Sequence, residues 1–101
     1  MNEELYKEAI KKWGEISQLD MVVEECAELI KSIQKLKRMD YNGRGNHILS
    51  SVAEEVVDVS IMLEQMNLIF DKHAFKDRVE IIRNSKLYNL KILLKKQQGG
   101  N

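Results

Sequence analysis

The sequence contains no proline in its 101 residues. Proline breaks the interior of helices, so a chain without it can run in long uninterrupted helices. Apolar residues recur at intervals of three and four positions over most of the chain, a spacing that places them on one face of an α-helix. Together these two features predict an all-α fold.

Four helical segments follow from this spacing, over residues 2–13, 17–39, 46–70 and 75–96. Gly14 is expected to end the first segment, and the clearest loop is residues 40–46, where glycines, asparagines and an aspartate gather. A short connection between two long helices favours antiparallel packing, so we expect a four-helix bundle-like domain around a central helix hairpin. Residues 1–97 are expected to form this single domain, followed by a disordered tail over 98–101.

The charges balance, because sixteen basic and sixteen acidic residues give a formal net charge of zero. Nothing in this balance favours nucleic acid or a membrane surface as a partner. Cys26 is the only cysteine, so no intrachain disulfide can form. The chain shows no signal peptide and no apolar run near the roughly 20 residues that span a bilayer. We expect a cytoplasmic protein, and its short length favours a homodimer or homotetramer.

Acidic residues form one repeated pattern on the two long central helices. Each helix carries two adjacent glutamates and a third acid three residues later, which are Glu24, Glu25 and Glu28 in the first and Glu54, Glu55 and Asp58 in the second. Residues three apart share a helix face, and an antiparallel hairpin can bring the two faces together. Facing carboxylates repel unless a cation bridges them, and carboxylate oxygens suit Mg²⁺ or Mn²⁺. Solvated acidic faces are also common on helices, so spacing alone leaves both interpretations open.

The acid pattern resembles the ExxE and ExxD signature of the MazG-like nucleoside triphosphate pyrophosphohydrolases. Lys12-Trp13-Gly14 with Gln18, and Lys86-Leu87 near the end, are similar to flanking segments of the small phage and bacterial branch of that family. The resemblance covers Lys12 to Leu90. It departs from the family at Ala27 and Val57, where many members have glycine, and at Asn89-Leu90, a stretch that is often basic.

The resemblance implies a fold of the all-α NTP pyrophosphohydrolase type and a Mg²⁺ cofactor, for which Mn²⁺ can substitute. It assigns the metal ligands as Glu25, Glu28, Glu55 and Asp58. The implied reaction is attack of a metal-activated water on a nucleoside triphosphate, which gives a nucleoside monophosphate and pyrophosphate. The candidates for catalysis are Glu24, Glu25, Glu54 and Glu55. Of these, Glu24 and Glu54 lie outside the ligand set, and each either acts as a base or supporting group or faces solvent.

Five further residues are candidates for substrate binding: Trp13, Gln18, Lys31, Arg83 and Lys86. The lysines and the arginine suit phosphate oxygens, but they also suit ion pairs or a solvated basic face. Trp13 can stack on a base, although a lone tryptophan on an amphipathic helix more often packs in a core or interface. Gln18 can hydrogen-bond a base or a sugar.

A second hypothesis is a non-catalytic helical interaction module, whose acids are surface charges and whose apolar stripes mediate oligomerisation. A di-iron carboxylate bundle requires Glu-x-x-His pairs, and the chain has none. A P-loop is also absent from the sequence. His47 and His73 are expected at the surface, and Cys26 is expected to pack rather than react.

Overall fold

The structure is a computed structural model that describes residues 2–39 and 46–99, where every regular element is helical. The elements are α1 (Glu3–Trp13), α2 (Glu15–Arg38), α3 (Asn46–Ile69), a short 3₁₀ turn η1 (Asp71–His73) and α4 (Phe75–Gly99). The predicted all-α class is thereby confirmed. The α2 helix begins at Glu15 rather than at residue 17, and α4 continues past residue 96 to Gly99. The predicted loop over 40–46 lies outside the described residues except for Asn46, where α3 begins.

The chain divides into two compact units, Met1–Ile69 with the first three helices and Phe70–Asn101 with η1 and α4. The single domain expected over residues 1–97 stays a prediction. No helix among the described residues combines the length and apolar character needed to cross a membrane.

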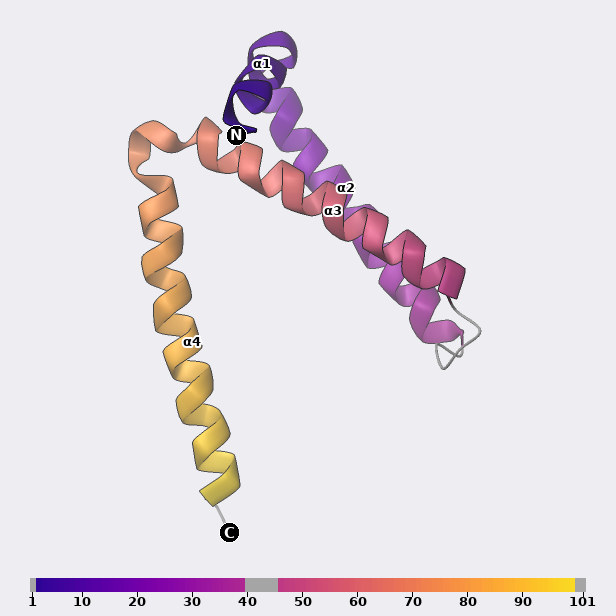
Figure 1. Ribbon diagram of the computed structural model, residues 1–101, viewed down its shortest axis with the longest axis vertical. Coiled ribbons are helices and arrows are strands. Elements are labelled where there is room, and N and C mark those ends of the chain that lie inside the picture. Colours follow the sequence, from indigo (N-terminus) through magenta and orange to yellow (C-terminus); the bar gives the residue numbers. More distant parts are fainter. Residues whose placement is uncertain (1, 40–45, 100–101) are drawn as a thin grey trace. The chain divides into compact units, whose positions relative to one another are not determined.

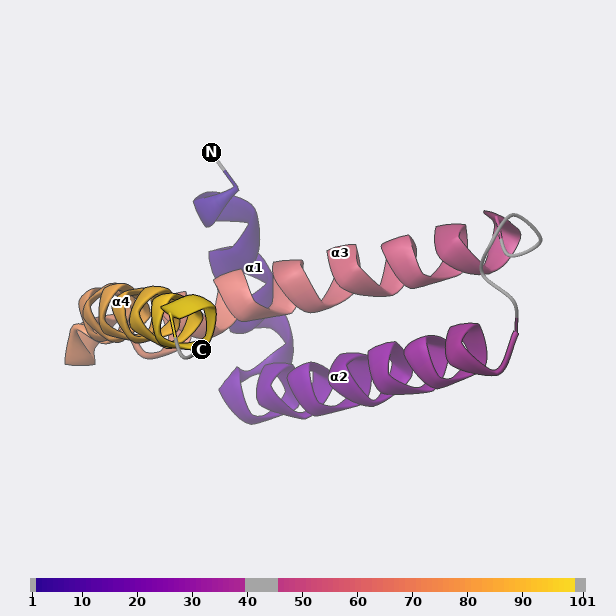
Figure 2. The same cartoon turned by 90° about the horizontal axis from the view of Figure 1, so that it is seen from below.

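Helices α2 and α3 form the predicted antiparallel hairpin of the first unit. Figures 1 and 2 both show the two helices side by side over most of their length. Each helix turns its half-buried residues towards the other, in line with its 3.6-residue periodicity. The buried apolar side chains of the unit are Tyr6, Ile48, Met62 and Ile69, and the buried polar ones are Gln18 and Gln65.

Gly14 alone connects α1 to α2. Its N–H donates to the Ile10 carbonyl at 2.8 Å, and its own carbonyl accepts from the Gln18 N–H at 3.1 Å. Its backbone angles are φ 91° and ψ 154°, a conformation that side chains disfavour and glycine tolerates. One residue therefore ends the first helix and begins the second. This sharp connection lets α1 fold back against α3, as Figure 2 shows.

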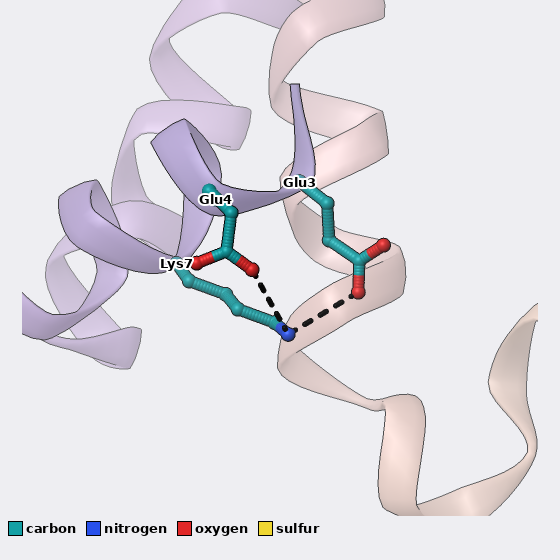
Figure 3. Close-up of polar contacts among 3 residues, drawn as sticks. All are labelled: Glu3, Glu4 and Lys7. Atoms are coloured by element: carbon teal, nitrogen blue, oxygen red, sulfur yellow. Dashed lines mark ion pairs between the residues drawn. The ribbon is translucent and has the colours of Figure 1, made fainter. Parts of the chain in front are cut away.

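The first turn of α1 carries the ion pairs drawn in Figure 3. The Lys7 ammonium lies 3.3 Å from a Glu3 carboxylate oxygen and 3.8 Å from a Glu4 oxygen. Acids near a helix N-terminus also interact favourably with the helix dipole. Because all three side chains are exposed, these pairs add little to stability.

In the second unit, a tight turn precedes α4. Ala74 adopts a left-handed conformation with φ 54°. Phe70 and Phe75, which flank η1 in the sequence, pack with their ring centroids 5.2 Å apart. Arg78 donates through Nε to the His73 carbonyl at 3.3 Å. His73 and His47 are both exposed, which confirms the expectation that these histidines lie at the surface.

Candidate metal centre

Three carboxylates converge where α2 and α3 face each other. Glu25 of α2 and Glu55 and Asp58 of α3 each offer an oxygen, and these oxygens all lie within 4.8 Å of one another. Glu25 and Glu55 are half-buried, while Asp58 is exposed at the edge. The hairpin thus brings together three of the four predicted ligands, because Glu55 and Asp58, three residues apart, share the face of α3 that lies opposite Glu25.

The surroundings of these groups disfavour their charged forms. Burial raises the pKa of the Glu25 carboxyl above its usual value, and the charges of Asp58, Glu55, Glu28 and Glu24 raise it further. Burial likewise raises the pKa of Glu55, and the charges of Asp58, Glu28 and Glu54 raise it further. Without a counter-ion, the folded hairpin therefore holds mutually repelling carboxylates.

Glu55 shows the most direct sign of a missing partner. Its Oε2 atom is buried and accepts no hydrogen bond from any group in the described part of the chain. A buried carboxylate oxygen without a donor is destabilising unless a cation or a water satisfies it. An all-oxygen donor set with such an atom fits a hard divalent ion such as Mg²⁺ or Mn²⁺.

The fourth predicted ligand, Glu28, stands beside this group. Its charge raises the pKa of both Glu25 and Glu55, so it lies in the same electrostatic neighbourhood. Its Oε1 atom, however, is 3.6 Å from the Lys31 ammonium on the next turn of α2. Lys31 is thus positioned at the edge of the acidic cluster through this ion pair. Glu24 and Glu54 are exposed, on the turns that carry Glu25 and Glu55.

A shallow depression lies next to the cluster on α3. It has a volume of about 520 Å³ and is lined by Ser50, Ala53, Glu54, Val57 and Asp58. Asp58 therefore borders both the carboxylate cluster and open space. The candidate metal centre is accessible to a small polar molecule from this side.

A larger groove lies between α1 and α3, and the hydrogen-bonded pair of Tyr6 and Glu64 within it was not anticipated from the sequence. The groove has a volume of about 1100 Å³, and Trp13, Tyr6, Glu64 and Gln65 contribute to its lining. The Tyr6 hydroxyl donates to a Glu64 carboxylate oxygen, and this hydrogen bond, with burial and the Glu64 charge, raises the pKa of Tyr6. Gln65 is only 7% exposed, and its Oε1 accepts no hydrogen bond within the described residues. Sequence spacing gives no signal for this pairing, because it depends on how α1 docks.

The predicted substrate-binding residues fall in different places. Gln18 is only 5% exposed, so it belongs to the core of the first unit rather than to an open surface. Trp13 is exposed at the end of α1, with the Lys12 ammonium 5.5 Å from its ring centroid. Arg83 and Lys86 are exposed on α4, in the second unit, and Arg83 Nη1 lies 3.4 Å from Glu80. Cys26 is half-buried on α2, consistent with a packing role.

Fold and site together define an all-helical protein with a carboxylate cluster set into a helix hairpin. No protein-family model matches the chain, and no curated protein or solved structure compared with it does so either. The geometry of the cluster and the acid motif are therefore the basis for the function proposed next.

Proposed function

We propose that this protein is a Mg²⁺-dependent nucleoside triphosphate pyrophosphohydrolase of the MazG-like type. The observation that carries the proposal is the convergence of Glu25, Glu55 and Asp58, whose oxygens lie within 4.8 Å of one another. The unpartnered, buried Oε2 atom of Glu55 supports it further. A solvated surface acid can satisfy its oxygens with water, whereas the buried Glu55 oxygen needs another partner, which a bound cation would supply.

The residues that would hold Mg²⁺ are Glu25, Glu28, Glu55 and Asp58. When bound, the ion would neutralise phosphate oxygens and lower the pKa of a coordinated water, and Mn²⁺ would substitute for it. Glu28 would exchange its ion pair with Lys31 for the metal, which would free the Lys31 ammonium for a phosphate oxygen. Either Glu24 or Glu54 would accept the proton of the attacking water.

The proposed reaction breaks the bond between the α-phosphorus and the oxygen that bridges it to the β-phosphate. The water oxygen bonds to the α-phosphorus, and pyrophosphate leaves with the bridging oxygen. The open depression beside Asp58 offers room for the triphosphate next to the acids. The exposed candidates for substrate contacts are still Arg83, Lys86 and Trp13. Gln18 also stays a candidate, although it lies in the core of the first unit. The proposal includes a cytoplasmic location and a homodimer or homotetramer.

A second candidate is a non-catalytic helical interaction module. Large apolar side chains are exposed on both helices of the hairpin, among them Ile16, Val23, Leu49 and Val56. Such surfaces mark contacts with other chains. This candidate requires no metal and predicts no turnover.

Pyrophosphate release from a panel of NTPs and dNTPs with MgCl₂ separates the two candidates. The wild type is expected to release pyrophosphate from at least one nucleotide. Glu55→Gln, which retains the side-chain shape, should lose at least about a hundredfold in kcat. Glu8→Gln removes an exposed carboxylate on α1 outside the cluster and should retain full activity. Absence of release from every nucleotide by a folded protein would refute the enzyme proposal. Equal activity of Glu55→Gln and wild type would refute the assigned site.

A further inference from the structure

The groove between α1 and α3, called the α1–α3 groove below, lies entirely within the first unit and has apolar walls. Leu5 and Trp13 of α1 and Val57 and Ile61 of α3 line it, and all four are exposed. Its volume of about 1100 Å³ is enough for a small organic molecule. None of the four proposed metal ligands lines the groove, so it can hold a ligand other than the metal.

Gln65 is the polar side chain of the groove that lacks a partner. It lines the groove, is only 7% exposed, and its Oε1 accepts no hydrogen bond within the described residues. Its Nε2 lies 3.9 Å from the Met62 sulfur, so the oxygen is the end of the amide that is left for a ligand. A buried amide oxygen without a donor destabilises the fold. A molecule in the groove that donates a hydrogen bond to Oε1 would remove that cost.

The neighbouring Glu64 adds a negative charge to the same groove. Its carboxylate accepts a hydrogen bond from the Tyr6 hydroxyl, and both residues line the groove. Because the only proton of that hydroxyl is donated to Glu64, Tyr6 offers a ligand nothing but acceptor lone pairs. Gln65, Glu64 and Tyr6 therefore all present oxygens that accept hydrogen bonds, and a matching ligand must donate them.

The basic side chains of the groove leave room for a cation. Lys11 and Lys12 line it and are exposed, and their charges are balanced by those of Glu8 and Glu64, which line it as well. The Lys12 ammonium lies 5.5 Å from the centroid of the Trp13 ring. Since the face of an aromatic ring attracts cations, the groove already holds one ammonium group against its wall.

We propose that the α1–α3 groove binds a small molecule that joins an apolar body to a protonated amine. The ammonium group would donate to Gln65 Oε1 and to the Glu64 carboxylate, and the apolar body would cover the exposed walls. Hydrogen bonds from a charged donor are stronger than those from a neutral one, which favours an amine over an alcohol. The inference does not depend on metal binding or turnover, so its test uses the full-length chain in EDTA without triphosphate.

Three probes with the same aromatic body and different head groups separate chemistry from shape: phenethylamine, phenethyl alcohol and hydrocinnamate. Trp13 is the only tryptophan of the chain and lines the groove, so its fluorescence reports binding. Phenethylamine should bind at least about tenfold more tightly than phenethyl alcohol. Hydrocinnamate should bind most weakly, because its carboxylate has no proton for Gln65 Oε1 and is repelled by Glu64.

Two glutamines provide a matched pair of variants. Gln65→Met retains the length of the side chain and removes the unpartnered oxygen. It should weaken phenethylamine binding at least about tenfold, and it should raise the Tm of the unliganded protein because a buried acceptor without a donor is removed. Gln34→Met replaces an exposed glutamine of α2 outside the groove and should bind like the wild type. Glu64→Gln removes the negative charge and should also weaken binding.

The inference is overturned if phenethylamine does not bind, as expected where another part of the chain or a second copy fills the groove. Equal affinity for the three probes, or unchanged affinity in Gln65→Met, would also overturn it, since the groove would then be an unselective apolar surface. If Gln65→Met loses its helical circular dichroism, Glu64→Gln decides in its place.

The four ribonucleosides serve as competitors, because Val57 also borders the depression beside Asp58. Phenethylamine should stay bound in their presence. Its displacement by a ribonucleoside would assign the groove to the base of the proposed substrate and would overturn the inference of a separate amine site.

Discussion

Neutralising one acid of the cluster should have opposite effects on stability with and without metal. Glu55 has a pKa raised by burial and by the charges of Asp58, Glu28 and Glu54. Between the unfolded and folded pKa values, the folded state binds more protons, so the stability of the metal-free wild type falls as pH rises through that window. Above the window the carboxylate is charged in both states and its repulsion is fully expressed. Glu55→Gln should therefore melt at a higher temperature than the wild type at neutral pH in EDTA.

Mg²⁺ should reverse this order. At ten times its dissociation constant, a ligand specific for the folded state adds about 1.4 kcal/mol to the free energy of unfolding. A cooperative unit the size of residues 1–69 shifts in Tm by about 4–8 °C for each kcal/mol. The wild type should therefore gain about 6–11 °C. Glu55→Gln lacks the charged ligand that holds the unpartnered oxygen and should lose most of that gain.

The assay is thermal unfolding followed by circular dichroism from about pH 4 to pH 8, in EDTA and in MgCl₂. Glu8→Gln is the matched control and should follow the wild type under both conditions. In EDTA, the difference between Glu55→Gln and wild type should vanish below the unfolded pKa of glutamate. A Glu55→Gln Tm equal to that of the wild type at neutral pH in EDTA would refute the repulsion argument. An equal increase in Tm with Mg²⁺ for the wild type and Glu55→Gln would refute the role of Glu55 as a ligand.

Two further predictions concern the first unit. Gly14→Ala should lower the free energy of unfolding, measured by urea titration, by about 1–3 kcal/mol. The backbone angles φ 91° and ψ 154° are strained for any residue with a side chain, even though open space surrounds the added methyl group. An unchanged urea midpoint would show that the connection relaxes. In a titration followed by ultraviolet absorbance, the pKa of Tyr6 should lie above the usual value for tyrosine, because its hydroxyl donates to Glu64. Glu64→Gln should lower that pKa again. Identical titrations of the two proteins would contradict the hydrogen bond.

Helix positions could be predicted from the sequence because they depend on local spacing. The absence of proline and the regular apolar stripes suffice for α2 and α3. The boundary at Gly14 was placed correctly, but the following helix starts immediately at Glu15. The apolar spacing does indicate this earlier start, because Ile16 lies three residues before Leu19 and seven before Val23.

The part of the candidate site that depends on the spacing of residues along a helix could be predicted from the sequence. The part that depends on which partner a side chain contacts could not. Glu25, Glu55 and Asp58 converge as their spacing indicated. Glu28 has a competing partner three residues away in Lys31, and sequence alone cannot tell which of the two it prefers. The burial of Gln18 and the pairing of Tyr6 with Glu64 depend on how α1 docks, which is tertiary information.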